Sequence, residues 1–126
     1  MMKEIISTEK APKAIGPYAQ GVKFHEFIFT SGQLPIDPTT GEMEVNDIRR
    51  ATELSINNIK SILEEKDSCL DKIIKVTIFV KDINMFTDIN EVYGKFFSDN
   101  SPARSCVQVA KLPKDALIEI EAIAYA

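Results

Sequence analysis

The chain has 126 residues, among them 19 acidic and 15 basic side chains, one histidine, two cysteines and no tryptophan. A chain of this length usually forms one domain whose core needs no disulfide or metal, so we expect a single domain over residues 1–126. The net charge of −4 gives no overall attraction to nucleic acid or to anionic lipid, which argues against both as partners.

No feature of the sequence indicates a membrane segment, a secretory signal or a metal site. The first residues lack the apolar stretch of a signal peptide, and the most apolar segment, residues 73–80, is interrupted by Lys75 and too short to span a bilayer. Cys69 and Cys106 are far apart and form no Cys-x-x-Cys pair, so no redox or zinc motif is visible. Two reduced thiols suit a reducing compartment, and we expect a cytoplasmic protein.

The first third of the chain predicts three short strands and two loops. Residues 3–7 are apolar at their centre, and residues 22–24 and 27–30 are rich in β-branched and aromatic residues, which predicts a hairpin. Residues 11–21 and 31–41 each contain several prolines and glycines, and we expect both segments to be loops.

A long amphipathic helix is predicted after these loops. Asn46 is a good N-cap, and Asp47 would place a negative charge in the first turn. Seven residues then follow at helical spacing and predict a helix that runs to about Lys66: Ile48, Ala51, Leu54, Ser55, Ile59, Ile62 and Leu63.

The rest of the chain predicts a strand, a second helix and two further strands. Residues 72–81 alternate as a strand does, and residues 85–97 have helical spacing and end before Pro102. Residues 104–110 and 117–125 are the last two strands. The resulting order, β-β-β-α-β-α-β-β, predicts an α+β sandwich with one mixed sheet and two helices on one face.

The last two strands predict which side chains share the face of the sheet opposite the helices. In residues 117–125 the alternate apolar residues suit burial beneath helices, so the others should share the open face: Leu117, Glu119, Glu121, Ile123 and Tyr125. If the valines of residues 104–110 also meet the helices, the open face gains the residues that alternate with them: Arg104, Cys106 and Gln108. The apolar members of this face would be exposed in a monomer, which usually marks an interface. We therefore expect a homo-oligomer that closes the face and can place an arginine and a carboxylate in a cleft between subunits.

Several motifs resemble those of the RidA family of reactive intermediate deaminases, also called YjgF. The resemblance covers essentially the whole chain, in order and with matching spacings. Its motifs are Ile-Gly-Pro-Tyr at residues 15–18, Phe-Thr-Ser-Gly-Gln at 29–33, Pro-Ala-Arg-Ser-Cys-Val at 102–107, Leu-Pro-Lys-Asp at 112–115 and Ile-Glu-Ile-Glu-Ala at 118–122.

The resemblance implies a chorismate-mutase-like α+β fold and a homotrimer with three clefts between subunits. It also implies hydrolysis of 2-iminobutanoate and 2-iminopropanoate to 2-oxo acids and ammonia, with neither cofactor nor metal. These imines are tautomers of enamines such as 2-aminoacrylate, which pyridoxal-phosphate dehydratases release. Related subfamilies that lack the arginine do not show this activity, so Arg104 extends the prediction from fold to function.

The resemblance assigns the two catalytic roles to Arg104 and Glu119. A planar guanidinium binds a carboxylate through two parallel hydrogen bonds, which suits Arg104 to a small 2-imino carboxylate. Glu119 matches the family carboxylate that orients or activates the attacking water. The structural alternatives are a salt bridge of Arg104 to Glu119 or Glu121, and a solvated strand carboxylate for Glu119.

Four further residues match positions that line or close the family's pocket. Cys106 would act through its backbone; it is a poor candidate for a nucleophile because no histidine lies near it in sequence, and inert packing is the favoured alternative. Gly32, beside Ser31, would let the backbone approach the ligand, and Tyr18 would supply an apolar wall with a hydroxyl. Their alternatives are ordinary turn and packing roles, while His25 suits a surface turn.

The chain departs from the family in one loop, and two functions other than deamination are also considered. Residues 98–101 form a shorter loop than is usual in the family, which bears on the size of the substrate. A ribonuclease or translation inhibitor is a second function, although the pI near 5.0 and the lack of a basic aromatic cluster argue against it. A non-enzymatic regulatory trimer that binds small carboxylates is a third, and it stays open because binding and catalysis use the same arginine.

Overall fold

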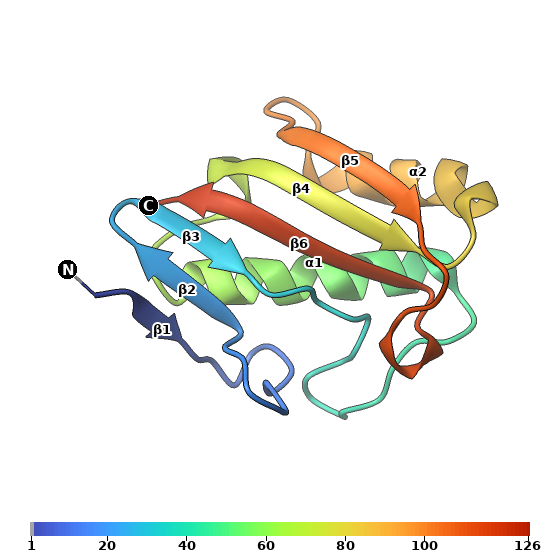
Figure 1. Cartoon of the computed structure of the whole chain (residues 1–126). Helices are drawn as coiled ribbons and strands as arrows, with labels where there is room; N and C mark the ends of the chain where they lie inside the picture. Colours follow the sequence, from blue (N-terminus) through green and yellow to red (C-terminus); the bar gives the residue numbers. More distant parts are fainter. Residues whose placement is uncertain (1) are drawn as a thin grey trace.

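A mixed sheet of six strands forms one layer of the structure, and two helices form the second layer (Figure 1). The computed structural model describes residues 2–126. Across the sheet the strands follow the order β1-β2-β3-β6-β4-β5, in which β4 and β5 are parallel and the other neighbours antiparallel. The strands are β1 (Glu4–Ile6), β2 (Gly21–Phe24), β3 (Phe27–Thr30), β4 (Ile73–Val80), β5 (Ala103–Gln108) and β6 (Ile118–Tyr125). The predicted order of elements and the α+β sandwich are confirmed.

Helix α1 (Ile48–Glu64) lies across the covered face of the sheet and buries all seven residues of the predicted stripe. Its N-cap is Asp47, whose carboxylate accepts hydrogen bonds from two backbone N–H groups of the first turn. The predicted N-cap, Asn46, is wrong by one residue. The Glu44 carboxylate accepts hydrogen bonds from the backbone N–H groups of Asn46 and Asp47, and it thereby holds Asn46 outside the helix.

Helix α2 (Phe86–Phe96) follows a 3-10 turn at Ile83–Met85 and packs beside α1. Arg49 of α1 joins the two helices through ion pairs with Asp88 and Glu91 of α2. No helix within residues 2–126 is long and apolar enough to cross a membrane.

The face of the sheet without helices carries both large apolar and charged side chains. Phe27, Phe29 and Tyr125 each expose 45% of their surface. Glu119 and Glu121 lie on the same face, because they alternate with the buried residues of β6. Of the apolar residues predicted for this face, Tyr125 is exposed, whereas Leu117 and Ile123 are partly buried and Leu117 packs against the core. Phe27 and Phe29 of β3 supply the other exposed apolar side chains.

The side chains of strand β5 point to the opposite faces of the sheet from those predicted. Arg104 pairs with Val76 of β4 and Cys106 pairs with Ile78, and both partners are buried beneath the helices. Laterally paired residues point to the same face, so Arg104 and Cys106 face the helix side while Val107 faces the open side and exposes 44% of its surface.

The predicted open-face group of Arg104, Cys106 and Gln108 with the two glutamates is therefore wrong. Gln108 also faces the helix side, where its side chain accepts a hydrogen bond from the Ile83 backbone N–H. The physical reason is that β5 is a short edge strand with an apolar residue on the open face and polar residues on the covered one, so polarity does not indicate which face is buried.

Candidate active site

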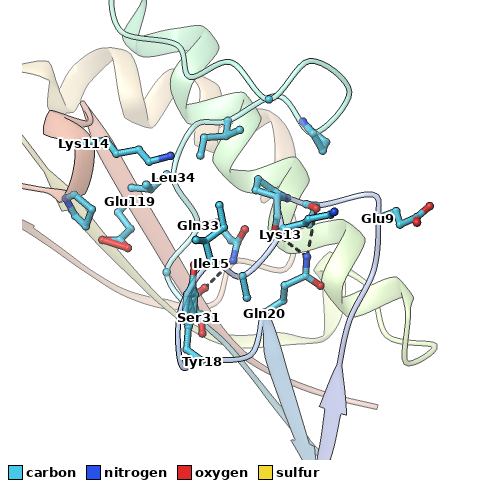
Figure 2. Close-up of a pocket in the computed structure, with 18 residues that line it drawn as sticks. Glu9, Lys13, Ile15, Tyr18, Gln20, Ser31, Gln33, Leu34, Lys114 and Glu119 are labelled. Carbon is cyan, nitrogen blue, oxygen red and sulfur yellow. Dashed lines mark hydrogen bonds between the residues drawn. The ribbon is translucent and has the colours of Figure 1, made fainter.

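Four of the six predicted site residues lie together in a groove of about 960 Å³ at one end of the sheet (Figure 2). These residues are Tyr18, Ser31, Gly32 and Glu119. A backbone bridge fixes the loop after β3 beside β6, because Gln33 N–H donates to the Ile120 carbonyl at 2.7 Å and Ile120 N–H donates back at 3.1 Å. This bridge places residues 31 and 32 next to Glu119.

A buried glutamine organises the loop that carries Tyr18. The Gln20 side chain accepts a hydrogen bond from Thr8 N–H at 2.7 Å and donates to the Thr8 and Pro12 carbonyls at 3.0 and 2.8 Å. Ser31 ties the same loop to β3, since its hydroxyl donates to the Ala19 carbonyl at 2.6 Å. The Ser31 hydroxyl proton is thus engaged in holding the loop, and the oxygen is left to accept a further hydrogen bond.

Gly32 is needed for the position of Glu119. A Cβ atom added to Gly32 would lie 2.7 Å from the Glu119 carboxyl carbon and closer still to one carboxylate oxygen. The predicted reason for a glycine was close approach of backbone to ligand. The structure shows close approach of backbone to the carboxylate, so any side chain at residue 32 would displace Glu119.

Glu119 has the electrostatic surroundings of a proton-transfer group. The carboxyl is half-buried, and burial raises its pKa, with a smaller increase from the negative charge of Glu121. A carboxyl with a raised pKa exchanges protons more readily near neutral pH than an ordinary glutamate does. Lys114 also lines the groove, and within residues 2–126 it forms no ion pair.

The other two predicted residues, Arg104 and Cys106, lie at the β5 edge against α2. Arg104 Nη1 donates to Asn90 Oδ1 at 2.7 Å, and the guanidinium carbon lies 5.3 Å from the Phe86 ring centroid and 4.8 Å from that of Tyr93. The salt bridge from Arg104 to Glu119 or Glu121 is not formed. Burial raises the pKa of the Cys106 thiol, which argues against a thiolate nucleophile there.

One chain does not bring Arg104 and Glu119 to the same small molecule. The two side chains lie on opposite faces of the sheet, and their partners on β4, Val76 and Phe79, are three residues apart. Three residues span about 10 Å along a strand. A site that uses both groups must therefore combine residues from two copies of the chain.

Sequence reasoning missed Gln20, Asn90 and Lys114 as parts of these sites. Gln20 and Asn90 gave no periodic or motif signal, because their roles depend on hydrogen bonds to distant segments. Lys114 lies within the Leu-Pro-Lys-Asp motif, but nothing in the motif marked it as part of the site. The structure draws attention to it because Lys114 and Asp115 both adopt the left-handed backbone region, with φ of 57° and 56°. Such backbone is rare outside glycine and is often found at functional sites.

The fold and the groove define an α+β sandwich of the chorismate-mutase-like class, with a carboxylate at the start of its central strand. A family model described as Endoribonuclease L-PSP matches residues 8–126. A RutC family protein of Pyrococcus abyssi is 55% identical over 125 residues, which cover 99% of this chain and 98% of that protein.

Two relatives from Escherichia coli are similar over the same span. The 2-iminobutanoate/2-iminopropanoate deaminase of strain K12 is 49% identical over 126 residues, with 98% of each chain covered. The crystal structure of E. coli TdcF with bound serine matches with a TM-score of 0.93 and 49% identity, over 98% of each chain. The chain belongs to the RidA/YjgF family.

Proposed function

We propose that this protein hydrolyses small 2-imino carboxylates, such as 2-iminopropanoate and 2-iminobutanoate, to 2-oxo acids and ammonia. The observation that carries the proposal is that the Arg104 guanidinium is held in place without a neutralising carboxylate. This guanidinium is held by a neutral amide and two rings, and within residues 2–126 no carboxylate neutralises it. An arginine held in this way keeps its positive charge for the carboxylate of a ligand.

Two relatives support a ligand of this kind. One carries the name of a deaminase of 2-iminobutanoate and 2-iminopropanoate, and the TdcF crystal structure contains serine. Serine has a carboxylate and a nitrogen on the same carbon atom, as a 2-imino acid does. We infer that enamines released by pyridoxal-phosphate dehydratases are the source of the substrate.

In the proposed reaction Arg104 orients the substrate and Glu119 handles the proton. Water adds to the imine carbon while the Glu119 carboxylate accepts a proton from it. The same carboxyl returns this proton to the nitrogen, which gives a tetrahedral intermediate with one hydroxyl and one amino group. It then passes the hydroxyl proton to the amino group as the carbonyl forms and the carbon–nitrogen bond breaks, so ammonia and the 2-oxo acid leave. Tyr18, Ser31 and Gly32 close the groove around this carboxyl.

The experiment that tests the function measures ammonia and 2-oxo acid from 2-aminoacrylate generated in the assay by a dehydratase. The protein should accelerate release well above the spontaneous rate. RNA in a parallel reaction should stay intact, because the chain has a net charge of −4. RNA cleavage that is lost in Arg104→Ala, without imine hydrolysis, would favour the ribonuclease function, and carboxylate binding without either activity would favour the regulatory one.

The proposed site requires more than one copy of the chain, and the family resemblance implies a trimer, so we expect sedimentation to give three times the 14.1 kDa chain mass. Phe29→Asp should lower this mass, because it places a charge among the exposed apolar residues of the open face. Val45→Asp is the control, since Val45 is even more exposed than Phe29 but lies in the loop before α1. A monomeric wild-type protein at micromolar concentration would contradict the shared site.

Gly32→Ala should reduce kcat for imine hydrolysis about 10- to 100-fold while the protein stays folded. The added methyl group displaces the Glu119 carboxyl, and a misplacement of about 1 Å can cost 100-fold in rate. Gly94→Ala in α2 is the matched control, because a Cβ there meets no atom within 4 Å. It should leave the rate unchanged and stabilise the helix by about 0.5–1 kcal/mol. Equal rates in both variants would show that Glu119 does not depend on Gly32.

A further inference from the structure

We propose that Asn90 is a positioning residue, which holds the Arg104 guanidinium in the orientation that receives the substrate carboxylate. The inference rests on the proposed function, because it concerns the arginine that this function uses. It adds a residue of α2 that does not itself touch the substrate.

Three side chains on one face of α2 surround the guanidinium. Phe86, Asn90 and Tyr93 are spaced four and three residues apart, which brings them together on the helix surface. Asn90 Oδ1 accepts the hydrogen bond from Nη1 at 2.7 Å, while the two rings lie near the guanidinium carbon at centroid distances of 5.3 and 4.8 Å. The two cation–π contacts hold the guanidinium against α2, and the amide hydrogen bond sets which side of it, the Nη1 side, faces Asn90.

The choice of a neutral amide matters for binding. Asn90 engages Nη1, and within residues 2–126 this is the guanidinium's one hydrogen bond, so Nη2 and Nε remain available as a pair of parallel donors. An aspartate would hold the arginine equally well but would offset its charge. Fixing a long side chain before the ligand arrives also lowers the entropy cost of binding.

This role predicts that stability and ligand binding change in opposite directions in one variant. Asn90→Asp should melt at or above the wild-type temperature, because it forms an ion pair with Arg104. It should nevertheless bind 2-oxobutanoate more than tenfold more weakly, because its carboxylate competes with that of the ligand. Asn90→Ala should weaken binding about tenfold, which equals 1.4 kcal/mol.

The test is calorimetric titration of the intact wild-type protein and the variants with 2-oxobutanoate, together with thermal unfolding. Asn84→Ala is the matched control, because Asn84 is exposed in the turn before α2, and it should change neither property. In turnover assays Asn90→Ala should raise KM with little change in kcat.

Three results would overturn the role of Asn90: wild-type affinity in Asn90→Asp, loss of affinity only in proportion to lost stability, or no binding of 2-oxobutanoate by the wild-type protein. A wild-type protein that binds 2-oxobutanoate but hydrolyses no imine would contradict the deaminase function and leave the role of Asn90 supported by the titrations.

Discussion

Replacing Arg104 with lysine should lower kcat/KM for imine hydrolysis about 30- to 1000-fold, although the positive charge is kept. The loss corresponds to about 2–4 kcal/mol, the cost of a charge-assisted, partly buried contact in the transition state. Lysine cannot form two parallel hydrogen bonds to the substrate carboxylate. It also lacks the planar guanidinium that lies 5.3 Å from the Phe86 ring centroid and 4.8 Å from that of Tyr93.

The measurement is 2-oxo acid formation against spontaneous hydrolysis of the same imine. Arg104→Ala should lose at least as much activity as Arg104→Lys, and both proteins should remain folded trimers. Arg50→Lys is the matched control, because Arg50 is half-exposed on α1 and pairs with Glu53, so its replacement should leave the rate unchanged. Near wild-type rates for Arg104→Lys would contradict two-pronged binding and reduce Arg104 to a general electrostatic aid.

The elements with one clearly buried face could be predicted from the sequence. The apolar stripe of α1 and the alternation of β6 are local patterns, and the apolar residues of both are buried between the sheet and the helices. The four groove residues were predicted by motif alone, and no local pattern would have brought Tyr18 and Glu119 together across a hundred residues. Their places in one groove depend on the bridge between Gln33 and Ile120, which sets the loop after β3 beside β6.

The orientation of β5 could not be predicted, because it is set by pairing with a strand about 30 residues earlier. The parallel register with β4 places Arg104 opposite Val76, on the side of the helices. A polar residue on a covered face contradicts the usual pattern, and α2 makes it possible by supplying an amide and two rings. The motif indicated that Arg104 matters, whereas the structure shows that Arg104 and Glu119 lie on opposite faces of the sheet in one chain.

Glu119→Gln should lower kcat about 100- to 10,000-fold and change KM much less. Glutamine keeps the shape of the side chain but cannot accept a proton from water, and general acid–base catalysis contributes rate factors of this size. The substrate carboxylate is bound by Arg104, so binding should survive the substitution. Stopped assays with increasing substrate supply would separate the two constants, and a variant with raised KM and intact kcat would place Glu119 in binding instead.

The pH dependence of kcat provides an independent check on Glu119. The carboxylate accepts the proton only when ionised, and burial together with Glu121 raises its pKa above the ordinary value of 4.5. As the pH falls, activity should therefore decline before an ordinary glutamate would protonate. Glu121→Gln removes the smaller of the two causes, so it should move this acid limb to lower pH and keep the plateau rate. An acid limb that stays in place in Glu121→Gln would mean that another group controls the rate, because the negative charge of Glu121 reaches Glu119 along one face of β6.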